Sequence, residues 1–73
     1  MHESSVYRVR RHTDTWWLEF NDDAIAVFDS AENAADHGRQ IAATLARTLH
    51  REVRLVVHAL DDTVQTEQLF PAR

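Results

Sequence analysis

Five histidines are the residues of this sequence best suited to bind a metal ion. They stand at His2, His12, His37, His50 and His58. A histidine zinc site in a helix places two of them four residues apart, or follows a recognised histidine and carboxylate spacing. The histidines in the helical stretch do not have that spacing. We therefore expect surface histidines, no metal and no cofactor, with His58 as an imidazole exposed at a sheet edge.

Paired carboxylates occur at Asp22-Asp23 and at Asp61-Asp62. Acid–base catalysis requires two carboxyl groups that converge across a cleft, whereas neighbouring aspartates in a turn point apart into water. The chain has no cysteine to serve as a nucleophile, and one glycine cannot form a phosphate-binding loop. We therefore predict turns at both pairs and no catalytic activity.

The chain is organised around residues 30–59, a long amphipathic helix that leads through a short turn into the most apolar strand. Asp29 or Ser30 can cap the start of the helix, and Arg47 suits the helix dipole near its end. Its apolar stripe is predicted to pack on a sheet through Ala34, Gly38, Ile41, Ala42, Leu45 and Leu49. A glycine on that stripe indicates either close approach of the helix to the sheet or a tolerated cost.

Alternating apolar and polar residues predict strands over residues 5–10, 15–20, 24–28, 53–60 and 63–67. The order β-β-β-α-β-β is typical of an α+β domain with one helix on one face of a mostly antiparallel sheet. A right-handed crossover places the fourth strand parallel to the first, giving the strand order 3-2-1-4-5. The helix should then pack against Tyr7, Val9, Trp16, Leu18, Leu55 and Val57. We expect a single domain over residues 1–73, with an ordered core at about residues 5–68.

Composition argues against several classes of function. The formal net charge of −4 makes nucleic acid an unlikely partner. Residues 1–5 lack the order of a signal peptide, and no apolar run has transmembrane length, so we expect a cytoplasmic protein without a membrane partner. A domain of 73 residues buries only about 60% of its unfolded surface, and a second copy would cover more.

Short motifs resemble a family of short bacterial proteins of unknown function. The family pattern is a W-x-V strand, F-D-T or F-D-S, an Ala-rich helix, L-x-V-H and a D-G turn. The matching features here are Trp17, Phe28-Asp29-Ser30, the Ala-rich helix, Leu55-Val56-Val57-His58 and Asp61-Asp62. This chain departs from the pattern at Asp62, where the family has glycine, and in its longer approach to the fourth strand. The resemblance supports the fold and implies no activity, cofactor or catalytic residue.

The sheet face opposite the helix is the candidate interaction face. Strand alternation places on it Val6, Arg8, Arg10, Trp17, Glu19, Arg54, Val56 and His58. Trp and Arg are enriched at protein interfaces, which favours a homodimer with Trp17, Val6 and Val56 otherwise left in water. Alternatively, bases stack on Trp17 and phosphates meet Arg8, Arg10 and Arg54 in a nucleic-acid-binding module. In a third interpretation the Arg stems only cover Trp17.

Overall fold

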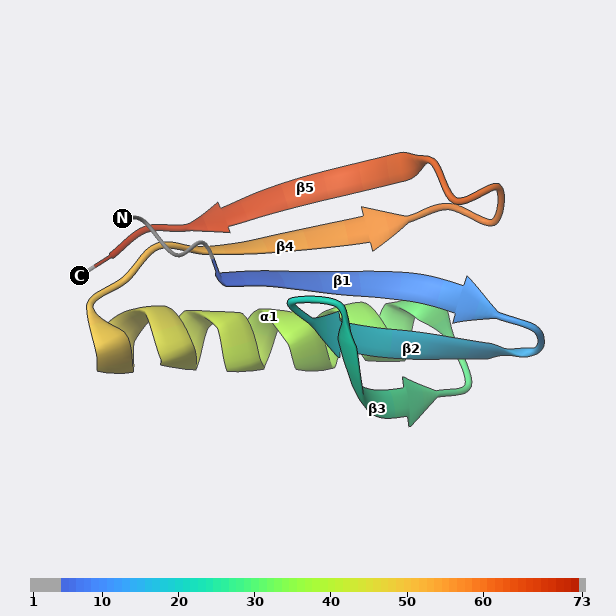
Figure 1. Cartoon of the computed structure of the whole chain (residues 1–73), viewed down its shortest axis with the longest axis horizontal. Helices are drawn as coiled ribbons and strands as arrows, with labels where there is room; N and C mark the ends of the chain where they lie inside the picture. The colour runs from blue at the N-terminus through green and yellow to red at the C-terminus, as the bar shows by residue number, and fades with distance from the viewer. Residues whose placement is uncertain (1–4, 73) are drawn as a thin grey trace.

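The computed structural model describes residues 5–72, so His2 lies outside the described residues. The elements are β1 (Ser5–His12), β2 (Thr15–Phe20), β3 (Asp23–Phe28), α1 (Ala31–Leu49), β4 (Val53–His58) and β5 (Val64–Phe70). They form one sheet in the order β3-β2-β1-β4-β5. Strand β1 runs parallel to β4, and the other neighbours are antiparallel. Figure 1 shows α1 running along the sheet. The outer strands of this sheet are β3 and β5. The predicted α+β fold and strand order are confirmed.

Helix α1 begins and ends with the expected kinds of cap. The Ser30 hydroxyl accepts a hydrogen bond of 3.1 Å from the Asn33 N–H, so Ser30 rather than Asp29 is the N-cap. At the other end His50 adopts a left-handed conformation with φ 52°, and its N–H donates to the Ala46 carbonyl. These contacts satisfy backbone groups that a helix end otherwise leaves unpaired.

Small residues form the face of α1 that contacts the sheet. The buried positions of the helix are Ala34, Ala35, Gly38, Ala42 and Ala46. Ile41 and Leu45 lie at the border of this face and are only half-buried. The prediction that Leu49 packs on the sheet is wrong, because its side chain is 48% exposed. The contact follows the narrow row of small residues, which lets the helix axis come close to the strands.

Gly38 lies where this approach is closest. A Cβ atom at position 38 would lie 3.0 Å from Cδ1 of Leu55 and 3.3 Å from Cδ1 of Leu18. Both leucines are completely or almost completely buried. Of the two interpretations of this glycine, the structure therefore favours close approach of the helix to the sheet.

The strand ends differ from the sequence expectations at the turns. Strand β1 continues to His12, which pairs with Thr15, and the turn is confined to Thr13 and Asp14. Strand β4 ends at His58 instead of residue 60. Strand β5 begins at Val64 and continues to Phe70, which packs against the core. Asp62 in the predicted turn between β4 and β5 adopts φ 68°, a left-handed conformation in which Asp is enriched among non-glycine residues.

Candidate interaction face

The face of the sheet opposite α1, here called the open face, contains all eight predicted interaction residues. Leu18 and Leu55 point toward Gly38 of the helix, so their immediate strand neighbours point the other way. The registers place Arg8 beside Glu19 on β2 and beside Val56 on β4. Further pairs on this face are Arg10 with Trp17 and Val6 with Arg54.

Charged side chains from three parts of the chain meet on the open face. Glu19 is only 6% exposed, and its carboxylate lies 3.6 Å from Arg10 Nη1 and 3.3 Å from His12 Nε2. Arg10 also donates two hydrogen bonds to the carboxylate of Asp62, at 3.0 and 3.3 Å. A buried carboxylate is costly unless it is paired and hydrogen-bonded. The basic partners of β1 therefore allow Glu19 to lie under the surface.

His58 extends this network to β4. Its Nε2 lies 3.2 Å from Arg8 Nη1, and its Nδ1 lies 2.9 Å from the carbonyl oxygen of Asp62. A guanidinium can only donate, so Nε2 accepts the hydrogen bond from Arg8, and Nδ1 is placed to donate to the Asp62 carbonyl. The expectation of an edge-exposed His58 is wrong, since this residue is 6% exposed. It is buried because β5 makes β4 an inner strand and Arg8 lies against the ring.

Val56 is a second correction to the expected open face. The sequence places it in water, but the residue is 5% exposed. Its neighbours in register are Arg8 on β1 and Glu67 on β5. Long side chains of this kind cover apolar surface with their methylene stems while their charged ends stay in water. The apolar area available at this point of the face is therefore small.

The turn between β4 and β5 is held by its own acidic side chains. The hydrogen bond from Arg10 lowers the pKa of Asp62 below its usual value, and the same contact raises the pKa of Arg10. The hydroxyl and N–H groups of Thr63 lower the pKa of Asp61. Asp61 thus stabilises the turn, as the sequence predicted for this pair, whereas Asp62 also contacts Arg10 of β1.

Asp62→Asn is expected to make the free energy of unfolding less dependent on pH under acidic conditions. The folded state lowers the Asp62 pKa below the unfolded value of about 3.9, so its contribution is present above that pH and is lost as pH falls through the folded pKa. The variant should be less stable near neutrality but lose less stability on acidification below about pH 5. Urea unfolding at a series of pH values measures this slope, with Asp14→Asn as a control in another exposed turn. Equal slopes for native protein and Asp62→Asn would contradict the assignment.

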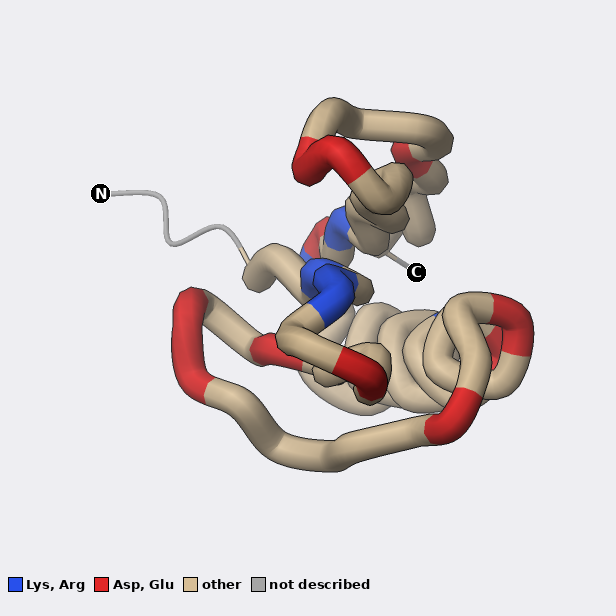
Figure 2. Tube along the Cα trace, turned by 90° about the vertical axis from the view of Figure 1, so that its right-hand side faces the viewer, with Lys and Arg blue, Asp and Glu red and all other residues tan. Residues whose placement is uncertain are grey.

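The arginines of the open face are mostly neutralised by the chain itself. Arg10 contacts Glu19 and Asp62, and Arg54 Nε lies 3.1 Å from Glu67 Oε2. Within residues 5–72, Arg8 contacts no carboxylate and bonds Nε2 of His58 instead. Figure 2 shows acidic positions on the turns around the basic positions of the sheet. A phosphate backbone would have to displace these internal carboxylates from two of the three arginines.

Exposed apolar side chains lie along β3, the outer strand beside Trp17 of the open face. Trp17 pairs in register with Val27, which is 58% exposed, and Ile25 in the same strand is 50% exposed. We call Trp17, Ile25 and Val27 the β3 patch. The Trp17 ring stacks on His12 with centroids 4.0 Å apart, and its Nε1 donates to the Thr15 hydroxyl at 3.0 Å.

Ile25 and Val27 are absent from the predicted interaction residues. The signal for them was present, because Ala24-Ile25-Ala26-Val27 alternates small and large residues and indicates a strand. The face to which the larger side chains belong depends on the pairing of β3 with β2. That pairing shifts by one residue at Leu18/Glu19, where β3 contains a bulge.

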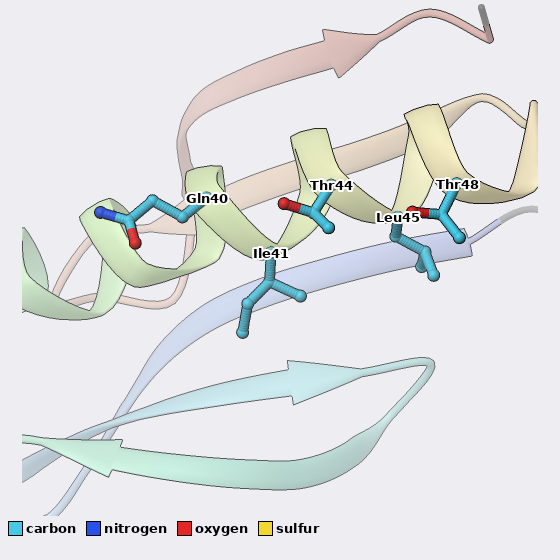
Figure 3. Close-up of a pocket in the computed structure, with 5 residues that line it drawn as sticks. All are labelled: Gln40, Ile41, Thr44, Leu45 and Thr48. Atoms are coloured by element: carbon cyan, nitrogen blue, oxygen red, sulfur yellow. The ribbon is translucent and has the colours of Figure 1, made fainter.

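A separate apolar groove of about 480 Å³ lies along α1 and is lined by Gln40, Ile41, Thr44, Leu45 and Thr48. In Figure 3, Ile41 and Leu45 point from the helix toward the strands below it. The lining includes no charged side chain that would orient a ligand.

Within residues 5–72, neither a cluster of metal ligands nor a membrane-spanning helix is present. No group of three or more His, Asp or Glu side chains there is placed to hold a metal ion. No helix there combines the length and the apolar character that a membrane span requires.

Comparisons with protein-family models, curated proteins and solved structures found no match for this chain. The resemblance to short bacterial proteins of unknown function therefore stays a prediction. Function has to be argued from the open face, its internal contacts and the β3 patch.

Proposed function

We propose that this protein is a small non-catalytic interaction module that self-associates as a homodimer through the β3 side of its open face. The observation that carries the proposal is the β3 patch, in which Ile25 and Val27 are at least half exposed beside Trp17 on an outer strand. Large apolar side chains gathered on one strand are typical of an interaction site, whereas isolated ones are ordinary surface.

Burial of this patch would add to the apolar area that this short chain removes from water. Fully burying a Val or Ile side chain is worth about 1.5 to 3 kcal/mol relative to full exposure, and Val27 and Ile25, at 58% and 50% exposed, would gain roughly half of that. A two-fold interface uses the same patch on both copies, so each buried residue contributes twice. Trp17 is of the residue type most enriched at the centre of protein interfaces.

The polar network suits the border of such an interface. The side-chain polar atoms that are buried within residues 5–72 all have hydrogen-bond partners. Arg10 and Glu19 are paired with each other beside Trp17, so a partner that covers the β3 patch leaves no unpaired charge there. Interfaces commonly combine an apolar centre with a satisfied polar rim.

Nucleic-acid binding through Arg8, Arg10, Trp17 and Arg54 is the alternative proposal and has less support. Arg10 and Arg54 already contact carboxylates, and one face of Trp17 is stacked on His12. The net charge of −4 opposes a polyanion as well. Catalysis has no support in the arrangement of side chains described above.

Trp17→Glu is expected to shift the protein from dimer toward monomer. A carboxylate at this position would have to lose its water in the interface, and it would lie close to its symmetry mate. Sedimentation equilibrium across a concentration series measures the dissociation constant of the native chain and the variant. Leu69→Glu is the matched control, because Leu69 is 49% exposed on the opposite outer strand.

Two further results complete this test. Far-UV circular dichroism establishes that each variant is folded, and Val27→Glu at an exposed position replaces Trp17→Glu if that variant unfolds. A native chain that remains at the 8.5 kDa monomer mass at every concentration contradicts the proposal. Equal dissociation constants for native protein and Trp17→Glu would show that the interface does not include Trp17.

A further inference from the structure

We infer that two copies join by antiparallel pairing of their β3 strands about a two-fold axis through Val27, so that the two sheets become one continuous sheet. This inference rests on the proposed self-association and specifies its geometry and its partner, a second copy of this chain. Strand β3 is the last strand on its side of the sheet, so its outer backbone edge has no neighbouring strand within residues 5–72. An unpaired edge is a template for another strand.

The two outer strands differ in their suitability for this pairing. Strand β5 carries Glu67 near its middle, and this carboxylate is ion-paired with Arg54. A charge at that place on an outer strand opposes edge-to-edge association. Between Asp23 and Asp29, by contrast, β3 contains only the apolar residues 24–28. The central residues of β3 are uncharged, so pairing of two β3 strands buries no charged side chain there.

The bulge selects the register. Leu18 pairs with Ala26 and Glu19 pairs with Ala24, which leaves Ile25 as the extra residue of β3. The regular part of the strand is thus residues 26–28, and its centre is Val27. An axis through this centre sets Val27 opposite Val27 of the second copy, and Phe28 opposite Ala26. The acidic ends of the two strands are then not opposite each other, since Asp29 faces Ile25.

This register continues apolar rows across both faces of the joined sheet. On the open face the row is Trp17, Val27, Val27 and Trp17, because Trp17 is the β2 neighbour of Val27. On the helix side, the row contains Trp16 and Phe28 of one copy, followed by Ala26 and Leu18 of the other copy. Cross-strand pairs that involve aromatic and β-branched side chains stabilise sheets. The strand is therefore its own complement, which favours a second copy over an unrelated protein.

The position of α1 leaves room for this pairing. The helix packs mainly over β4 and β1, in the middle of the sheet, and contacts β3 less. A two-fold axis perpendicular to the sheet puts both helices on the same side, each over its own inner strands. Figure 1 shows β3 at the margin of the molecule, away from β4 and β5. Three regular residues per copy form a short ladder, so we expect weak, reversible association typical of small interfaces.

A single cysteine at the axis tests this geometry. The native chain has no cysteine, so each variant carries one thiol and any disulfide joins two copies. Residues directly opposite in an antiparallel pair have Cα atoms about 4.5 to 5.5 Å apart, which is within the range that a disulfide can span. Val27→Cys is compared with Leu69→Cys, an exposed position on the other outer strand.

We expect Val27→Cys to form a covalent dimer at least about tenfold faster than Leu69→Cys at equal concentration under mild oxidation, because pairing raises the local thiol concentration. The reaction is followed by non-reducing electrophoresis, with circular dichroism as the check of folding. A native dimer in which Val27→Cys links no faster than Leu69→Cys overturns the β3 geometry and leaves the proposed self-association standing. A native chain that is monomeric throughout overturns both.

Discussion

Replacing Leu18 with alanine is expected to lower the free energy of unfolding by about 2 to 5 kcal/mol. Leu18 is fully buried, lies beside Val9 in the sheet and packs under Gly38 of the helix. Its removal leaves a cavity between the two layers that the sheet and α1 cannot easily close. A chain of 73 residues has a total stability of only about 4 to 11 kcal/mol, so Leu18→Ala threatens the fold itself.

Urea unfolding followed by circular dichroism measures this loss, and Leu45→Ala is the informative comparison. The sequence alone predicts Leu45 as a core residue with a loss of about 2 to 5 kcal/mol. The structure leaves Leu45 half-buried at the border of the helix contact, so its loss should be smaller than that of Leu18. Leu69→Ala, at an exposed position, should change little. A Leu45→Ala loss equal to that of Leu18→Ala would contradict the packing described above.

Gly38→Leu is expected to be the most disruptive change in the helix. The first atom of any side chain at this position already meets Leu55 at 3.0 Å and Leu18 at 3.3 Å. A larger side chain must push α1 away from the sheet, and overpacking of this kind costs about 1 to 3 kcal/mol or more. Better helix propensity returns only about 1 kcal/mol, so the net change should be destabilising.

Gly38→Ala separates close packing from helix propensity. Its methyl group meets the ends of two flexible leucine side chains, which can move by a few tenths of an ångström. The propensity gain of about 1 kcal/mol should then roughly offset the contact cost. Thermal unfolding of both variants makes the comparison. A Gly38→Leu protein as stable as the native one would show that the helix does not approach the sheet as closely as described here.

Local patterns account for most of the fold. The alternation of residues 15–20 predicts β2 with its observed bounds, and the acidic and basic ends of the helical stretch predict the extent of α1 to within about two residues. The strand order also follows, because a right-handed crossover after the third strand has few alternatives in a sheet of this size. In these respects each short segment contains the information about its own structure and its nearest connections.

The candidate face required the tertiary structure. The sequence placed the eight residues of the open face on one side of the sheet but left Val56 and His58 in water. Their burial depends on side chains from distant segments, since Arg8 contacts His58 across 50 positions of the chain and Arg10 contacts Asp62 across 52. No local period predicts how a flexible Arg side chain will lie over a neighbouring strand.

The β3 patch was likewise predictable from the sequence only in part. Residue type alone determined that Ala24-Ile25-Ala26-Val27 would be an extended apolar segment. The predicted strand order already made this segment an outer strand, but only the assembled sheet decided that a bulge isolates Ile25 and that Val27 stands exposed beside Trp17. The physical reason is that strand formation follows from the side chains of the segment itself, whereas exposure depends on which other segments happen to lie next to it.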